Sequence, residues 1–141
     1  MKNILFILVF MTISFFVNCQ DTAVCHASLG NYNSSDTILL DDFVKLSELS
    51  LSSSEYSIVS YNAEFVAQEG YTVLLKGNSN TITQEIKDLL LSRAVNMKKS
   101  PPYFPGHDPN CFRFFFTDII VKSTENNEVN IGYLMCKLKM N

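Results

Sequence analysis

The segment from His107 to Cys111 holds the residue types best suited to chemistry, because a histidine, Asp108 and a cysteine follow one another closely. Cysteine and histidine can bind zinc, and a thiol beside a histidine can act as a nucleophile. A structural zinc site needs about four ligands, and the further candidates would have to come from elsewhere in the chain. We therefore interpret the segment as a surface loop or disulfide anchor and expect no resident metal. A metal- or thiol-binding function of His107, Asp108 and Cys111 is the alternative.

Other patterns that announce catalysis are missing from the sequence. It contains no G-x-S-x-G, no phosphate-binding glycine loop, no H-E-x-x-H and no acidic calcium loop. The adjacent acids Asp41 and Asp42 are typical of the first turn of a helix. The formal net charge of −3 lacks the basic excess of nucleic-acid-binding proteins. We expect a non-catalytic protein without a cofactor and without a nucleic-acid partner.

The first 19 residues have the pattern of a signal peptide, with Lys2 followed by an apolar run over residues 4–11. Two cleavage patterns fit. Signal peptidase I would leave Gln20 as the first residue, whereas signal peptidase II would leave Cys19 carrying a lipid. We expect an exported protein that is periplasmic, anchored in the outer membrane or secreted, with membrane contact only through the possible lipid anchor.

Three cysteines remain after the signal peptide, and one disulfide among them is expected in an exported protein: Cys25, Cys111 and Cys136. Cys111 and Cys136 flank a predicted hairpin centred near Asn126 and Asn127. In that register they are displaced by roughly 20 Å along the strands, too far for a bridge. Cys25 paired with either of the other two is therefore the expected bridge.

The order of elements predicts a β-rich α+β fold, with antiparallel, sandwich-like sheets and one packed α-helix. A polar, flexible leader over residues 20–36 is expected to precede a single domain over residues 37–141. Thr81 and Gln84 form a capping-box pattern for a helix that ends near Asn96 or Met97. Apolar residues alternate along four predicted strands: Tyr56 to Ala67, Tyr71 to Leu75, Phe112 to Lys122 and Ile131 to Lys139.

An aromatic stripe is the most informative feature of the last two strands. The predicted register places Phe115 opposite Leu138 and Thr117 opposite Cys136, on one apolar face. The opposite face would then carry the stripe. It is interpreted either as a strand that is covered on both faces or as an exposed patch for a protein partner. The candidate interaction residues are Phe112, Phe114, Phe116 and Tyr133.

Three segments together resemble the C-terminal domain of the gliding-motility and type IX secretion protein GldM: S-Y-N-A-E-F-V, G-N-S-N-T-I-T-Q-E-I-K-D-L-L and F-F-F-T-D-I-I-V-K. The resemblance implies a β-rich extracytoplasmic interaction or scaffolding domain that binds a protein in a Bacteroidetes-type envelope, with no catalytic residues to transfer. The family's full-length members carry a membrane helix and several periplasmic domains before this one, whereas here only a signal peptide is predicted. A stand-alone exported domain is therefore expected.

Overall fold

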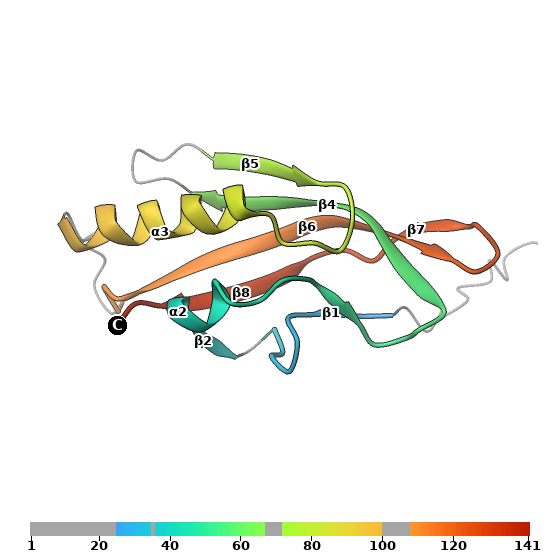
Figure 1. The fold of residues 1–141 in the computed structure, drawn as a ribbon, viewed down its shortest axis with the longest axis horizontal. Helices are drawn as coiled ribbons and strands as arrows, with labels where there is room; N and C mark the ends of the chain where they lie inside the picture. The colour runs from blue at the N-terminus through green and yellow to red at the C-terminus, as the bar shows by residue number, and fades with distance from the viewer. Residues whose placement is uncertain (1–24, 35, 67–71, 100–107) are drawn as a thin grey trace, which may run out of the picture.

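The computed structural model describes residues 25–34, 36–66, 72–99 and 108–141. Its main element is a six-stranded sheet (Figure 1). Five of the strands follow one another in the order β2-β8-β6-β4-β5, and the sixth, β7, pairs with β6. The elements are β1 (Ala27–Ser28), β2 (Thr37–Leu39), α2 (Leu40–Phe43), β3 (Ser50–Leu51), β4 (Tyr56–Val66), β5 (Thr72–Gly77), α3 (Gln84–Lys99), β6 (Cys111–Ser123), β7 (Glu128–Asn130) and β8 (Leu134–Lys139). The prediction of a β-rich α+β fold is confirmed. Most neighbouring strands are antiparallel, whereas β2 runs parallel to β8.

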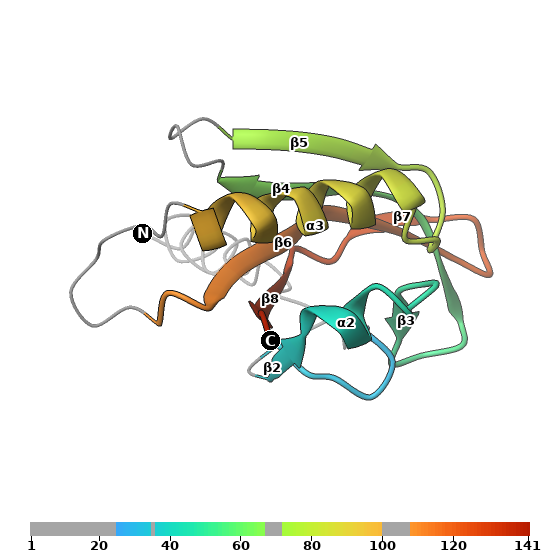
Figure 2. The same ribbon diagram turned by 60° about the vertical axis from the view of Figure 1, so that its left-hand side comes forward.

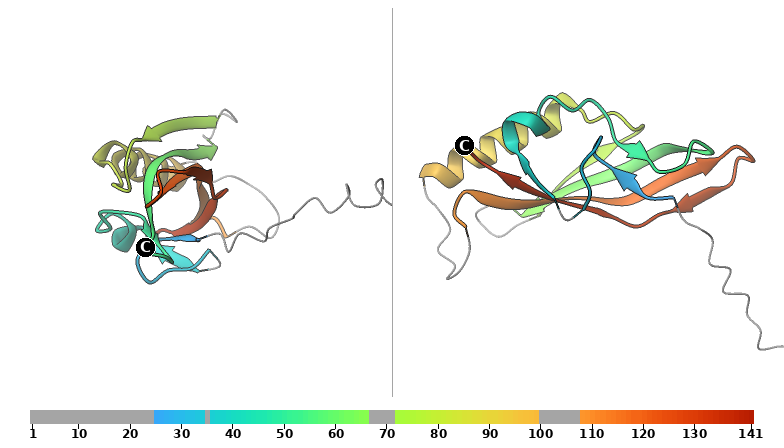
Figure 3. Two further views of the ribbon diagram at one scale, coloured as in Figure 1. Left: turned by 90° about the vertical axis from the view of Figure 1, so that its right-hand side faces the viewer. Right: turned by 90° about the horizontal axis from the view of Figure 1, so that it is seen from below.

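Both helices lie on the same side of the main sheet (Figure 3, right), and α3 runs along β4 and β6 (Figure 2). The helix α3 buries one stripe against the sheet, made of Ile86, Leu90, Ala94 and Met97. These positions recur every three or four residues, which is the spacing of one helical face. We call the sheet face under the helices the inner face and the opposite one the outer face.

The start of α3 differs from the prediction. The hydroxyl of Thr83 accepts a hydrogen bond from the backbone N–H of Ile86 at 3.4 Å, which is the geometry of an N-cap. The predicted cap, Thr81, instead forms an isolated β-bridge with Glu48. Both residues are threonines two positions apart, and tertiary pairing of Thr81 decides which of them caps the helix. The helix continues to Lys99, slightly beyond the predicted end.

Four aromatic rings form a continuous row across the inner face. Phe43 of α2 contacts Phe114 edge-on at 5.8 Å between ring centroids, and Phe114 contacts Phe116 at 4.7 Å. Tyr61 of β4 extends the row, with its ring 5.1 Å from that of Phe116. Edge-to-face rings at these distances add to the stabilisation that burial gives. The row therefore ties α2 to the centre of the sheet.

The pairing of β6 with β8 differs from the predicted register by an odd number of residues. Phe114 lies opposite Cys136 and Phe112 opposite Leu138, whereas the prediction placed Thr117 and Phe115 at these positions. The hairpin turn is centred earlier than predicted, because Lys122 pairs with Glu128. An odd shift exchanges the two faces of a strand. The predicted assignment of β6 side chains to the two faces is therefore wrong.

The N-terminal segment over residues 25–34 is part of the packed structure. Ala27 pairs with Leu51 and Ser28 with Ser50, which joins β1 to β3 in a small second sheet. Leu29 is 1% exposed and belongs to the main core. The expectation of a flexible leader is wrong for these residues, because Cys25 and Leu29 are buried in the core and Ala27 and Tyr32 pack against it. Residues 20–24 lie outside the described part.

The predicted signal peptide and Cys19 also lie outside the described residues. Within residues 25–34, 36–66, 72–99 and 108–141, no helix is long and apolar enough to cross a membrane.

Candidate functional site

Asp108 and Cys111 meet at the turn that begins β6. The Cys111 thiol donates a hydrogen bond to Asp108 Oδ2 at 3.2 Å, and the backbone N–H of Asn110 donates to Asp108 Oδ1 at 2.9 Å. These hydrogen bonds lower the pKa of Asp108, the one from Asn110 most strongly. Burial and the adjacent carboxylate raise the pKa of the Cys111 thiol. A raised pKa keeps the sulfur protonated at neutral pH, and nucleophiles and metal ligands need a thiolate.

His107, the third member of this group, lies outside the described residues. In the described part of the chain, no three histidine, cysteine or acidic side chains gather as metal ligands would. The structure thus brings Asp108 and Cys111 together in a turn. Their hydrogen bonds account for the start of the strand.

No disulfide joins any two of the three described cysteines, so the expected bridge from Cys25 is not formed among them. Cys111 pairs with Lys139 while Cys136 pairs with Phe114, which places the two thiols on opposite faces of the sheet. That separation opposes a Cys111–Cys136 bridge, although the observed displacement is smaller than the predicted one. Burial raises the pKa of Cys136 to about 12 and also raises that of Cys25.

Three of the four predicted interaction residues are inside the protein. Phe112, Phe114 and Phe116 are 6%, 0% and 0% exposed, because the actual register turns them toward the helices. Of the two interpretations of the stripe, burial of these three rings agrees with the covered strand and contradicts the exposed aromatic patch. Tyr133 alone is on the surface, where its side chain is 72% exposed.

Tyr133 stands at the rim of a hollow of about 440 Å³. The hollow forms where the N-terminal segment passes close to the junction of β7 and β8. Its lining combines polar side chains with an apolar base, including His26, Asn33, Ser34, Ser52, Ile119 and Leu134. Sequence reasoning missed this partnership, because residues 26–34 were expected to be a flexible leader.

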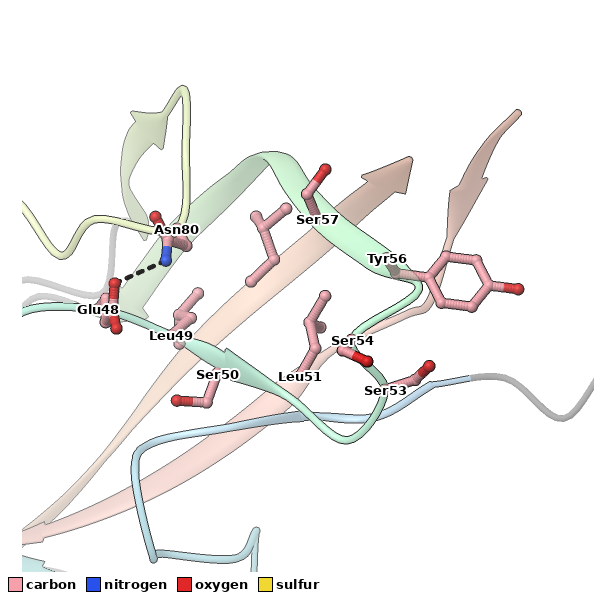
Figure 4. Close-up of a pocket in the computed structure, with 10 residues that line it drawn as sticks. Glu48, Leu49, Ser50, Leu51, Ser53, Ser54, Tyr56, Ser57 and Asn80 are labelled. Atoms are coloured by element: carbon pink, nitrogen blue, oxygen red, sulfur yellow. Dashed lines mark hydrogen bonds between the residues drawn. The ribbon is translucent and has the colours of Figure 1, made fainter. Parts of the chain in front are cut away.

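A second hollow, of about 360 Å³, lies between β3 and β4 (Figure 4). Leu49 and Leu51 point into it, whereas the ring of Tyr56 points away. At one end, Asn80 Nδ2 donates a hydrogen bond to Glu48 at 2.8 Å, and the backbone N–H of Leu49 donates to the Asn80 carbonyl at 2.8 Å. The most polar groups of this hollow thus hold β3 to the loop before α3, and we assign it a structural role.

A third depression, of about 240 Å³, is an apolar groove between α2 and α3. Its lining includes Leu40, Leu91, Ala94, Val95 and Met140. Leu91 and Val95 are 38% and 51% exposed, whereas the other three side chains are buried. We call this surface the α2–α3 groove.

The C-terminal residue clamps one end of the α2–α3 groove. Lys98 Nζ donates a hydrogen bond to the backbone oxygen of Asn141 at 2.7 Å, and Asn141 Nδ2 donates to Asp41 at 2.6 Å. Figure 1 shows the C-terminus beside α2 and below the C-terminal end of α3. The two helices are therefore joined by polar contacts, which fixes the width of the groove at this end.

Two of the groove residues, Leu91 and Val95, could have been found from a local pattern in the sequence. Leu89, Leu90 and Leu91 are consecutive, and Val95 follows Leu91 by one helical turn. A helix that covers a sheet needs only one apolar stripe. The second stripe of Leu91 and Val95 exceeds that need and indicates another contact surface.

The sequence matches no family model and no curated protein in comparisons with known proteins.

Proposed function

We propose that this chain is a non-catalytic, extracytoplasmic binding domain that holds a protein partner of the cell envelope in the α2–α3 groove. The observation that carries the proposal is the exposure of Leu91 and Val95 beside the buried floor formed by Ala94 and Met140. Apolar side chains that gather in a concave surface with a polar rim are typical of protein-binding sites.

The two exposed side chains have the geometry of a docking ridge. Leu91 and Val95 are four residues apart on α3, so they project from the same face one helical turn apart. Leu40 of α2 lies across the groove from them. Apolar side chains of a partner can enter between the helices and bury their surface against both, which gains about 25 cal/mol per Å² of apolar area.

The rim of the groove gives the partner a charge preference. Lys98 and Lys99 form the last turn of α3, and both are exposed. Asp41 and Lys98 are both hydrogen-bonded to Asn141, and neither contact removes the charge of its side chain. Together with Lys99, two basic side chains face one acidic side chain at this end, which favours a partner with acidic residues beside its apolar segment, because complementary charges speed association and select against wrong partners.

Export is part of the proposal, and it rests on the signal-peptide pattern of residues 1–19 and on the resemblance to the GldM C-terminal domain. An intact mass of the mature protein from its native host tests it. A chain beginning at Gln20, or a diacylglycerol on Cys19, is the expected result, and the second result would place the domain on a membrane surface. An unprocessed chain beginning at Met1 would contradict export.

Site-directed photocrosslinking in the native host tests the groove. A photoreactive amino acid replaces Val95 in one variant and Leu74 in the control. Leu74 is a matched position because it is 54% exposed, close to the 51% of Val95, but lies on the outer face of β5. We expect a discrete crosslinked protein from position 95 and none from position 74.

A second substitution decides whether the crosslink depends on the groove. Leu91→Asp, combined with the photoreactive residue at position 95, should remove the crosslinked protein, because a carboxylate cannot enter an apolar contact without loss of hydration. A thermal melt of each variant checks that the fold is kept. Equal crosslinking from positions 95 and 74, or crosslinking that persists with Leu91→Asp, would contradict the proposal.

A further inference from the structure

The hollow beside Tyr133 has the features of a small-ligand site that is separate from the α2–α3 groove. Its volume of about 440 Å³ falls within the range of about 300–1,000 Å³ that is typical of small-ligand pockets. Two segments far apart in the sequence build it, namely residues 26–34 with Ser52 on one side and residues 119–134 on the other.

The backbone that carries Tyr133 is fixed on both sides of the hairpin. The N–H of Ile131 donates to the Ile119 carbonyl at 2.9 Å, and the N–H of Ile119 donates to the Gly132 carbonyl at 3.2 Å. The N–H of Gly132 also donates to Asn130 Oδ1 at 2.8 Å. Gly132 has a φ of +89°, a conformation that a residue with a side chain rarely adopts. A ring that is 72% exposed is thus presented from a rigid backbone, which reduces the entropy lost on binding.

The base of the hollow is apolar. Ile119 and Leu134 are 1% and 4% exposed, and the partly buried Ile131 lies beside them in the lining of the hollow. With the Tyr133 ring at the rim, this floor offers apolar contact from two directions. A ligand therefore needs a C–H-rich face.

The walls of the hollow are polar and carry no formal charge. No aspartate, glutamate, lysine or arginine is among the described residues that line it. His26, Asn33 and Ser34 line the hollow, and among the described residues His26 and Asn33 use their backbone N–H groups, not their side chains, to bond Ser52 and Asp36. An imidazole, an amide and a hydroxyl together donate and accept, as a partner with several hydroxyl groups requires.

We propose that this hollow binds a neutral saccharide. A pyranose ring has a C–H-rich face that can stack on the Tyr133 ring and a rim of hydroxyl groups that can hydrogen-bond to Asn33, Ser34 and His26. An anionic ligand would lack a formally charged partner in these walls, and a purely apolar ligand would leave their polar groups without hydrogen bonds. The match between an apolar floor and neutral polar walls selects the saccharide.

Titration of the mature protein with neutral oligosaccharides tests the proposal. The probes are trimers of glucose in α and β linkage, of mannose and of N-acetylglucosamine, followed by isothermal calorimetry and by backbone amide NMR shifts. At least one probe should bind with a Kd below about 1 mM. The largest shifts should lie at residues 26–34 and 131–134.

Three variants separate stacking from other effects. Tyr133→Ala should weaken binding at least tenfold, whereas Tyr133→Phe keeps the stacking ring and should change it less than threefold. Leu74→Ala is the control for loss of an exposed apolar side chain elsewhere, and it should leave binding unchanged. Tyr133 is on the surface, so its variants are expected to fold, which a thermal melt confirms.

The saccharide site is overturned if none of the probes binds below about 10 mM. It is equally overturned if binding survives Tyr133→Ala or if the amide shifts centre on the hollow between β3 and β4. Neither result touches the α2–α3 groove, which shares no residue with this site.

Discussion

The two faces of β6 are made from similar residues and have opposite surroundings. Phe114 and Phe116 point to the inner face and are 0% exposed, whereas their neighbour Phe115 points to the outer face and is only partly buried. Arg113, which precedes Phe114, points to the outer face and is exposed. The residue type alone therefore does not show whether an aromatic side chain in this strand is buried, because the pairing register decides which face it points to.

The largest expected effect comes from removing one ring on each face. Phe114→Ala deletes the central ring of the inner aromatic row and should destabilise the protein by about 3–5 kcal/mol, because a cavity is left in a packed core. Phe115→Ala removes a partly buried ring from the outer face and should cost about 1 kcal/mol. Urea denaturation of the two variants measures both values.

The comparison between the faces fails if the two substitutions destabilise equally. Phe114→Leu provides a milder inner-face variant in case Phe114→Ala does not fold at all. It keeps an apolar side chain of reduced volume and should still lose more stability than Phe115→Leu.

The sequence could predict the elements but not how they meet. The alternation in residues 56–66 and the helical spacing from Ile86 to Ala94 are local patterns, and both elements were predicted within a few residues. The register of β6 with β8 depends on where the turn is centred, and the run of similar residues around Asn126 does not fix that. A small error in the turn therefore reversed the predicted faces and the predicted site.

The candidate site was predicted even less well, for two physical reasons. Tyr133 was predicted as a candidate interaction residue, but its partners in the hollow come from a segment that packs through Cys25 and Leu29 and pairs with β3. The α2–α3 groove depends on the position of α2, which is a single turn and whose packing involves the contact of Phe43 with Phe114. Contacts between segments distant in sequence leave no local pattern.

Gly77, on the inner face, gives a second test of how tightly this face is packed compared with the outer face. Gly77 of β5 pairs with Tyr61 of β4, and a Cβ at Gly77 would overlap the Tyr61 ring. Tyr61 is 0% exposed and its hydroxyl is bonded to Thr81, so the ring has little freedom to move. Gly77→Ala should therefore destabilise the protein by about 2–3 kcal/mol.

The matched double variant locates the cause. Tyr61→Leu removes the ring from above Gly77, so Gly77→Ala should cost much less in that background than in the wild type. Chemical denaturation of the four proteins gives the coupling. An unchanged cost of Gly77→Ala would show that the clash lies elsewhere.

At Asp118 the buried side chains of β6 change from even to odd positions. Replacing Asp118 should destabilise the protein less than Gly77→Ala does. From Phe112 to Phe116 the buried residues of β6 are the even positions, whereas after Asp118 they are the odd positions Ile119 and Val121. Asp118 has a φ of +46°, and its carboxylate accepts hydrogen bonds from Asn62 at 3.0 Å and from Asn130 at 3.3 Å. Asp118→Ala should cost about 1–2 kcal/mol, because alanine tolerates this backbone poorly and the hydrogen bonds are lost.

The control for Asp118 separates backbone strain from hydrogen bonding. Asp118→Gly relieves the strain but not the loss of the two bonds, so it should cost less than Asp118→Ala in a thermal melt. If both variants are as stable as the wild type, the irregularity in β6 does not depend on this side chain.

The smallest effect at neutral pH is expected for the hydroxyl of Tyr61, and it changes with pH. The hydroxyl donates a hydrogen bond to the Thr81 carbonyl at 2.6 Å, so Tyr61→Phe should cost about 1 kcal/mol at pH 7. Burial raises the pKa of Tyr61 to about 12 from an ordinary 10. A raised folded-state pKa means that this contribution is complete below pH 10 and is lost as the pH rises toward 12. The advantage of the wild type over Tyr61→Phe should therefore shrink across this window, as measured by urea midpoints at pH 7, 10 and 11. Cys136, whose pKa is also raised to about 12 by burial, titrates in both proteins and cancels in the difference. A difference that stays constant from pH 7 to 11 would mean that the inner face does not hold the Tyr61 hydroxyl away from water.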